Sequence, residues 1–160
     1  MSKVLRIADD AKKLLYSYAE MHTYGLIKIE ANKSFIPTDY RTNYNYGAIY
    51  CDIQNGKIVI PPNSADYIRV SGYIGGNGST QAFISVYNDE NNVAIATTLS
   101  LYQPTGNKYV SGPITSKVIK IPDKSKTYYV KMTIIAYNTD FTLNDGFGSE
   151  ASYICVEKII

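Results

Sequence analysis

Two stretches of the chain combine tyrosine with the polar side chains that bind sugars. Residues 38–50 read TDYRTNYNYGAIY, and residues 101–109 read LYQPTGNKY. Tyrosine rings stack on the apolar faces of sugar rings, while asparagine, aspartate and arginine bond to hydroxyl groups, and the same mixture dominates antibody paratopes. The candidate ligand-binding residues are therefore Tyr40, Arg41, Asn43, Tyr44, Tyr46, Tyr102, Asn107 and Tyr109.

An alternative interpretation of both stretches is that they reflect the composition of the whole chain. Sixteen of the 160 residues are tyrosine, and there is no tryptophan. Tyrosine is also enriched where subunits meet, so these rings would equally suit a trimer interface. The sequence leaves both interpretations open.

Patterns for catalysis or metal binding are weak. His22 is the single histidine and would have to serve every serine as a base, and no Gly-x-Ser-x-Gly motif is present. No Cys-x-x-Cys or His-Glu-x-x-His pattern suggests a metal site. A carboxylate pair for glycoside hydrolysis would depend on separation in space. The candidates for such a pair are Asp39, Asp52, Asp140, Asp145 and Glu150. We expect a protein that is not an enzyme, without cofactor or metal.

The first residues carry an apolar repeat with alternating spacings of three and four. This spacing is the seam of a coiled coil, and so short a helix needs partner helices or a domain to pack on. The spacing predicts a helix over residues 1–24, stopped by Gly25, that forms a trimeric stalk; packing on its own sheet is the alternative. The oligomerisation residues would be Val4, Ile7, Ala11, Leu14, Tyr18 and Met21.

Residues 25–160 read as one β-sandwich head domain. Strand-like runs occur at residues 26–30, 48–53, 57–60, 67–74, 82–87, 93–101, 117–121, 127–137 and 152–159. Several alternate between apolar and polar residues, and Asn55-Gly56 is a strong hairpin signal. The glycine-rich residues 72–78 read as a loop. The predicted core residues are Ile68, Val70, Val86, Val130, Met132, Ile134, Ile154 and Val156. The predicted fold class is all-β, an antiparallel jelly-roll-like β-sandwich preceded by a short N-terminal α-helix.

Composition argues against several classes of partner. The N-terminus has charges every few residues and no apolar core of a secretion signal, and no apolar run has the length of a membrane span. The net charge is +2 with both signs well mixed, so we expect no nucleic-acid binding. Cys51 and Cys155 each lie within a strand pattern, and we expect free, buried thiols.

The layout resembles the head domains of bacteriophage tail-fibre, head-fibre and baseplate receptor-binding proteins. The resemblance comes from the heptad helix leading into a sandwich, the segment IPPNSADYIRVSGYI at residues 60–74 and the closing strand SYICVEKII at residues 152–160. It implies a homotrimer on the virion surface that binds a host cell-surface glycan or protein and contacts other virion proteins through its N-terminus.

Two other classes fit the same sequence. One is a structural virion subunit, for capsid decoration or fibre assembly, with no ligand. The other is a carbohydrate-binding module. The mass in solution and a glycan array would distinguish these classes from a receptor-binding head.

Overall fold

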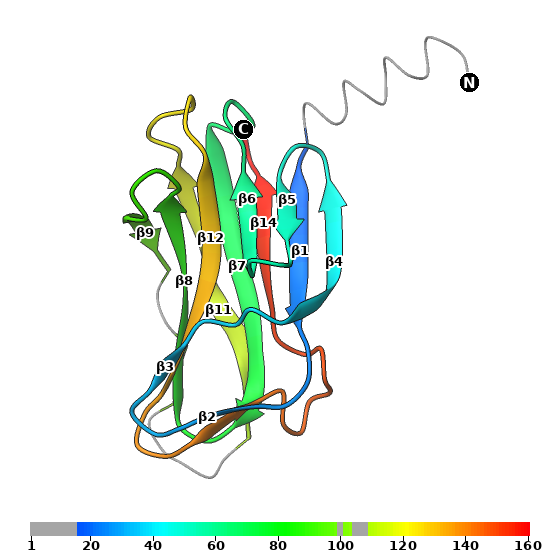
Figure 1. Cartoon of the computed structure of the whole chain (residues 1–160), viewed down its shortest axis with the longest axis vertical. Helices are drawn as coiled ribbons and strands as arrows, with labels where there is room; N and C mark the ends of the chain where they lie inside the picture. Colours follow the sequence, from blue (N-terminus) through cyan, green and yellow to red (C-terminus); the bar gives the residue numbers. More distant parts are fainter. Residues whose placement is uncertain (1–15, 99–100, 104–108) are drawn as a thin grey trace, which may run out of the picture.

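The computed structural model describes residues 16–98, 101–103 and 109–160, which form two stacked antiparallel sheets (Figure 1). Most of the strands run along the long axis, and the chain enters β1 at the same end at which the C-terminus lies (Figure 1). The strands in order are β1 (Tyr18–Thr23), β2 (Ile27–Ile29), β3 (Ser34–Phe35), β4 (Tyr40–Tyr46), β5 (Tyr50–Asp52), β6 (Lys57–Ile60), β7 (Tyr67–Asn77), β8 (Thr80–Asn88), β9 (Ala94–Thr97), β10 (Leu101–Gln103), β11 (Tyr109–Lys120), β12 (Tyr128–Ala136), β13 (Phe141–Leu143) and β14 (Tyr153–Lys158).

Each sheet mixes strands from distant parts of the chain. Sheet A has the order β2-β13-β7-β14-β1-β4, and β11 pairs with β7. Sheet B has the order β10-β8-β12-β6-β5, with β3 paired to β12 and β9 paired to β8. Strand β4 is therefore an edge strand of sheet A, and β1 lies between β4 and β14.

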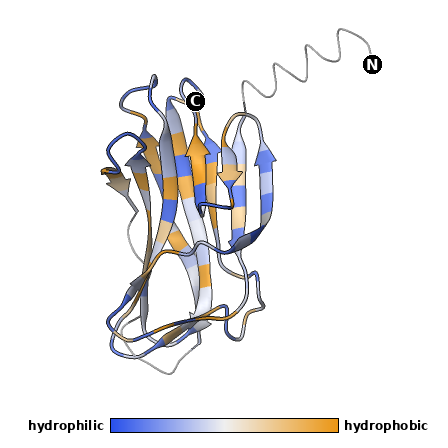
Figure 2. Ribbon diagram, in the orientation of Figure 1, coloured by the Kyte–Doolittle hydropathy of each residue, from blue (hydrophilic) through white to orange (hydrophobic). Residues whose placement is uncertain are grey.

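The core lies between the sheets and follows the predicted alternation. Every predicted core residue has no exposed surface, which confirms the register expected for these strands. The clearest example is β12, where Val130, Met132 and Ile134 are buried and alternate with the half-buried Lys131 and Thr133. Figure 2 shows this as bands of hydrophobic and hydrophilic colour along the central strands. The Asn55-Gly56 turn is confirmed too, since it joins β5 to β6 with Gly56 at a φ of 61°.

The predicted helix is wrong over residues 18–23, which form β1. Within this segment Ala19, Met21 and Thr23 are buried and the residues between them are half-buried, a period of two. The backbone pairs with β14 on one side and β4 on the other, and these two ladders decide the conformation. The remaining seam residues, Val4, Ile7, Ala11 and Leu14, lie outside the described residues. The β-sandwich begins before the expected boundary at residue 25.

One segment outside the predicted strands and one segment expected to be a loop both form strands. Residues 40–46 form β4, and most of the glycine-rich run belongs to β7. Glycine is required there by close packing: a Cβ on Gly72 would lie 2.7 Å from the Tyr153 carbonyl oxygen. A Cβ on Gly76 would meet the ring of Phe141 and lie 2.5 Å from the Thr142 carbonyl oxygen. The run of glycines therefore marks a crowded strand in place of a turn.

Both cysteines are free. Cys155 is buried as predicted, whereas Cys51 is only half-buried. The Sγ atom of Cys51 donates to the carbonyl oxygen of Glu20 at 3.3 Å, which links β5 of sheet B to β1 of sheet A.

Candidate functional site

The outer face of sheet A carries a continuous group of aromatic side chains. Because Ala19 and Met21 point into the core, Tyr18, Glu20 and His22 lie on the outer side of β1. The residues directly opposite them on β4 and β14 share that side. We call this surface the tyrosine face; its rings are those of Tyr16, Tyr18, His22, Tyr44, Tyr46, Tyr73 and Tyr153.

One row of rings crosses four strands of the tyrosine face. The ring centroids of Tyr44 and His22 are 6.3 Å apart, those of His22 and Tyr153 are 5.0 Å apart, and those of Tyr153 and Tyr73 are 6.0 Å apart and nearly parallel. Tyr16 and Tyr46 form a further pair at 5.7 Å. Tyr44 and Tyr46 are 57% and 41% exposed, so the rings at the β4 edge remain open to solvent.

The charged groups on the tyrosine face are paired with one another. The Nε2 atom of His22 lies 2.7 Å from Oε1 of Glu20, and the hydroxyl of Tyr18 donates to Oε2 of the same carboxylate. Burial, and then the bond to Glu20, raise the pKa of Tyr18. Arg69 and Glu157, on neighbouring strands, form an ion pair at 3.2 Å. The face therefore presents rings and satisfied charges to its surroundings.

His22 is held by acceptors on both sides of its ring. Its Nδ1 atom lies 2.8 Å from the carbonyl oxygen of Glu150, while Nε2 faces the Glu20 carboxylate. A carbonyl and a carboxylate accept hydrogen bonds, and an imidazole donates through both nitrogens only when it is protonated. This arrangement fixes the ring plane that contacts Tyr44 and Tyr153.

The far end of sheet A extends the aromatic surface. The ring of Tyr109, on β11, meets the ring of Phe147 edge-on at 6.1 Å, and the Phe147 side chain lies against Gly75 of β7. Tyr109 is 64% exposed. An exposed aromatic ring beside a row of other rings is typical of sites where other molecules bind.

The structure separates the ligand-binding residues predicted on β4. Tyr44 and Tyr46 lie opposite Glu20 and Tyr18 and belong to the tyrosine face. Asn43 lies opposite the core residue Met21, so it is on the other side of the strand, where it is exposed. Alternation along the strand thus places rings and amides on opposite sides. The expected site with both kinds of side chain does not form on β4.

Tyr40 is not available to a ligand, which corrects its assignment to the binding site. A register shift between His22 and Thr23 places Tyr40 opposite the buried Thr23, and its side chain is 4% exposed. Its hydroxyl has no hydrogen-bond partner among the described residues, and burial raises its pKa. Arg41 is exposed, and its guanidinium lies 3.9 Å from the ring centroid of Tyr24. Its role in binding, like that of Asn43, stays a prediction.

The second predicted stretch is described only in part. Tyr102 is in β10, where its backbone pairs with that of Gln81, and Tyr109 begins β11. Asn107 lies outside the described residues. Sequence reasoning did not assign Tyr73 and Tyr153 to a surface site, although Tyr73 falls on the polar side of an alternating run. Tyrosine at the solvent-facing positions of a strand, where charged residues are usual, is the sequence signal that could have predicted this face.

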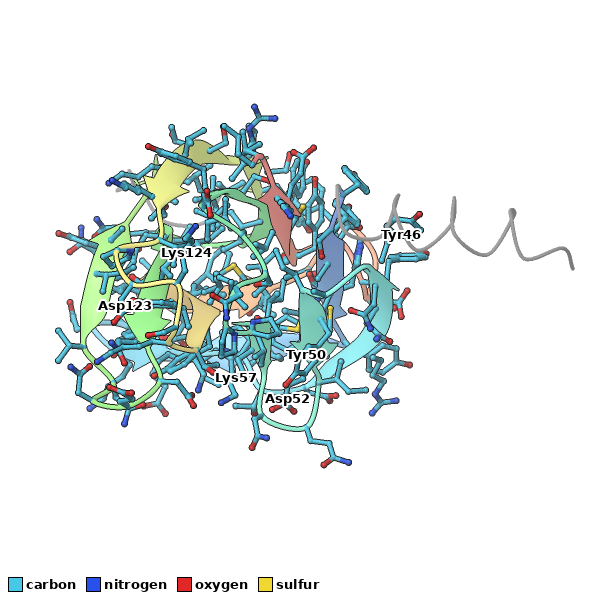
Figure 3. All side chains as sticks on the ribbon, turned by 90° about the horizontal axis from the view of Figure 1, so that it is seen from above. Tyr46, Tyr50, Asp52, Lys57, Asp123 and Lys124 are labelled. Carbon is cyan, nitrogen blue, oxygen red and sulfur yellow. The ribbon has the colours of Figure 1, made fainter. Side chains whose placement is uncertain are left out.

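A charged hollow of about 550 Å³ lies at the end of the molecule where β6 and β11 finish. Its lining includes Asp66, Lys124 and Asp123. Asp66 and Lys124 form an ion pair at 2.9 Å, and hydrogen bonds from Ser125 lower the pKa of Asp123. Figure 3 shows Asp123 and Lys124 well apart from Tyr46. Asp66 and Lys124 thus neutralise each other, and the Asp123 carboxylate accepts hydrogen bonds from Ser125.

The described residues contain neither a metal-binding cluster nor a membrane-spanning helix. Among them, no three His, Cys, Asp or Glu side chains gather closely enough to hold a metal ion. No helix in the same residues is long and apolar enough to cross a membrane.

Solved structures of low sequence identity share this fold. The chain is similar to Eiger TNF from S. frugiperda, with a TM-score of 0.59 and 11% identity, over 91% of this chain and 93% of that chain. It is also similar to murine APRIL, with a TM-score of 0.57 and 8% identity, over 90% and 99% of the two chains. No protein-family description and no curated protein matches the sequence. The fold is a TNF-like jelly roll.

Proposed function

We propose that this protein is a non-enzymatic, homotrimeric binding head whose subunits pack through the tyrosine face. The supporting observation is the row of rings from Tyr44 to Tyr73, which is contiguous, partly exposed and bordered by paired charges. Exposed aromatic surface without free charge favours a protein partner, because aromatic residues are enriched and charges depleted at interface cores.

A second copy of the chain is the partner that fits best. The first four positions of the apolar repeat predicted to form a self-associating stalk precede β1, and β1 supplies the centre of the tyrosine face. A stalk along a three-fold axis would therefore bring three copies of this face together. The fold that this chain shares with Eiger TNF and murine APRIL is consistent with a jelly-roll head of this kind.

The biological role proposed is attachment. The resemblance to phage fibre heads suggests a virion-surface protein that binds a host cell-surface saccharide or protein and joins other virion proteins through its N-terminus. A structural subunit would assemble in the same way without binding to cells. A carbohydrate-binding module would bind a glycan without needing to assemble.

Sedimentation of the full chain tests the assembly. We expect a trimer at micromolar concentration. Changing Tyr44 and Tyr46 together to glutamate should give folded monomers, because it places charge into the interface at two exposed positions. The control is Tyr50→Glu, a residue of similar exposure (45%) on β5 of sheet B, which should remain trimeric.

Two outcomes would contradict the proposal. A monomer for the unmodified protein would exclude self-association. A trimer for the Tyr44 and Tyr46 variant would show that the tyrosine face does not hold the subunits together. Adsorption of the labelled trimer to candidate host cells would then separate an attachment head from a structural subunit.

A further inference from the structure

A second hollow lies on the outer side of sheet B, on the opposite sheet from the tyrosine face. It has a volume of about 370 Å³ and is lined by Asn32, Gln81, Ile135, Ala136 and Tyr137. Gln81 pairs with Ile135 near the end of β12, and this end of the sandwich is remote from the point where the chain enters β1 (Figure 1). A trimer packed through sheet A would leave this hollow open.

The lining residues have the chemistry of a site for uncharged, hydroxyl-rich ligands. None of the five carries a formal charge. The carboxamides of Asn32 and Gln81 each provide donors and an acceptor, as a pair of neighbouring sugar hydroxyls requires. Tyr137 is 37% exposed and provides an aromatic ring, and Ile135 adds aliphatic surface. The volume lies at the small end of the range for ligand pockets, about 300–1,000 Å³.

Backbone hydrogen bonds hold the rim of the hollow in place. The amide of Asn32 donates to the carbonyl oxygens of Ala136 at 2.8 Å and Tyr137 at 3.0 Å. The amide of Ala136 donates to the carbonyl oxygen of Lys33 at 3.0 Å. The amide of Tyr137 donates to the carbonyl oxygen of Ser79 at 3.1 Å. Asn32 has a φ of 62°, which sets the turn that forms one side. Such a site needs little ordering on binding, which lowers the free-energy cost of binding a ligand.

We infer that this hollow is a subsite for a neutral saccharide, with Tyr137 stacking on a sugar ring and Asn32 and Gln81 bonding to its hydroxyls. The inference rests on the proposed attachment function and specifies its ligand class and its location. It replaces β4 as the stacking site, because β4 divides its rings and amides between two sides. Each subsite binds weakly, and three copies on one trimer gain affinity by multivalency.

The test uses the full chain on an array of neutral and of sialylated or sulfated glycans, followed by NMR titration of the best neutral glycan. Isoleucine methyl groups are labelled, and the Ile135 signal is assigned with the variant Ile135→Val. We expect the Ile135 methyl to shift on titration up to about 10 mM glycan. Tyr137→Ala and Gln81→Ala should each weaken binding by about tenfold, whereas Tyr137→Phe keeps the ring and most of the affinity. Gln54→Ala, at an exposed glutamine on the β5–β6 turn, is the matched control and should bind normally.

Three results would overturn the inference: no neutral glycan binds, the shifts occur elsewhere with Ile135 unaffected, or the charged glycans bind equally well. Sedimentation of the same samples reports on assembly separately. Loss of the trimer with an intact Ile135 shift would contradict the proposed assembly and leave the subsite in place. An intact trimer that binds host cells without using the hollow would contradict the proposed subsite and leave the proposed assembly in place.

Discussion

At Cys51 and Cys155, burial governs the reactivity of the thiols. Burial raises the pKa of Cys51 to about 12, and it also raises the pKa of Cys155, which lies on the outer side of β14 near Tyr18 and Ser71. The nucleophile in alkylation is the thiolate, whose fraction at a given pH falls as the pKa rises.

Alkylation should therefore be slow in the folded protein. With iodoacetamide at pH 8, we expect the native rate at Cys51 to be at least about a hundredfold below the rate in denaturant, and to continue rising with pH above 9. Mass spectrometry counts the modified thiols, and Cys51→Ser assigns the remaining signal to Cys155. A native rate equal to that of an unfolded thiol would contradict the burial of these residues.

At the scale of single strands, β4 and β7 show how packing determines what a local sequence becomes. In β4, the tyrosines and the asparagines that suggested a binding site lie on opposite sides of the sheet, because successive residues of a strand point in opposite directions. In β7, the glycines lie where neighbouring strands leave no room for a Cβ.

Replacing Gly76 by alanine should destabilise the protein by about 1–3 kcal/mol, because the new Cβ would collide with the ring of Phe141 and the carbonyl of Thr142. Gly112→Ala is the control. Among the described residues its Cβ would meet only the terminal methyl of Leu101, at 3.2 Å, so we expect a change within about 0.5 kcal/mol. Urea unfolding of both variants gives the two values. Equal costs would show that the crowding at Gly76 is relieved by movement of Phe141.

At the scale of the whole molecule, the two sheets offer two different surfaces. Sheet A presents aromatic rings with paired charges, and sheet B presents the uncharged hollow around Gln81. Self-association through one sheet leaves the other free, which is the arrangement that an oligomeric binding protein needs.

Thermal unfolding should accordingly depend on protein concentration. If the native state is a trimer, Tm rises by several degrees when protomer concentration increases from about 1 to 100 μM, because association stabilises the folded chain by mass action. The Tyr44 and Tyr46 double glutamate variant should melt at a lower temperature that does not change with concentration. A constant Tm for the unmodified protein would indicate that its folding and its assembly are not coupled.

The sequence by itself determined the class of the fold, the register of its central strands, the Asn55-Gly56 hairpin and the state of the cysteines. These features depend on local patterns: alternation with a period of two places Val130, Met132 and Ile134 on one side of a strand whatever its partners are. The same local patterns were insufficient at residues 18–23. Six residues fit a period of two and a period of 3.6 almost equally well, so pairing with β14 and β4 decided the conformation.

Only the tertiary structure decided which residues form the two surfaces. Tyr44, His22, Tyr153 and Tyr73 come from four strands, and their row exists because the ladders align those strands in one register. Likewise, Asn32, Gln81 and Tyr137 meet only where β8 and the turn before β3 reach the end of β12. Such contacts join residues distant in the chain. Sequence periodicity specifies the side of a strand on which a residue lies, whereas its neighbours on that side follow from how the sheets assemble.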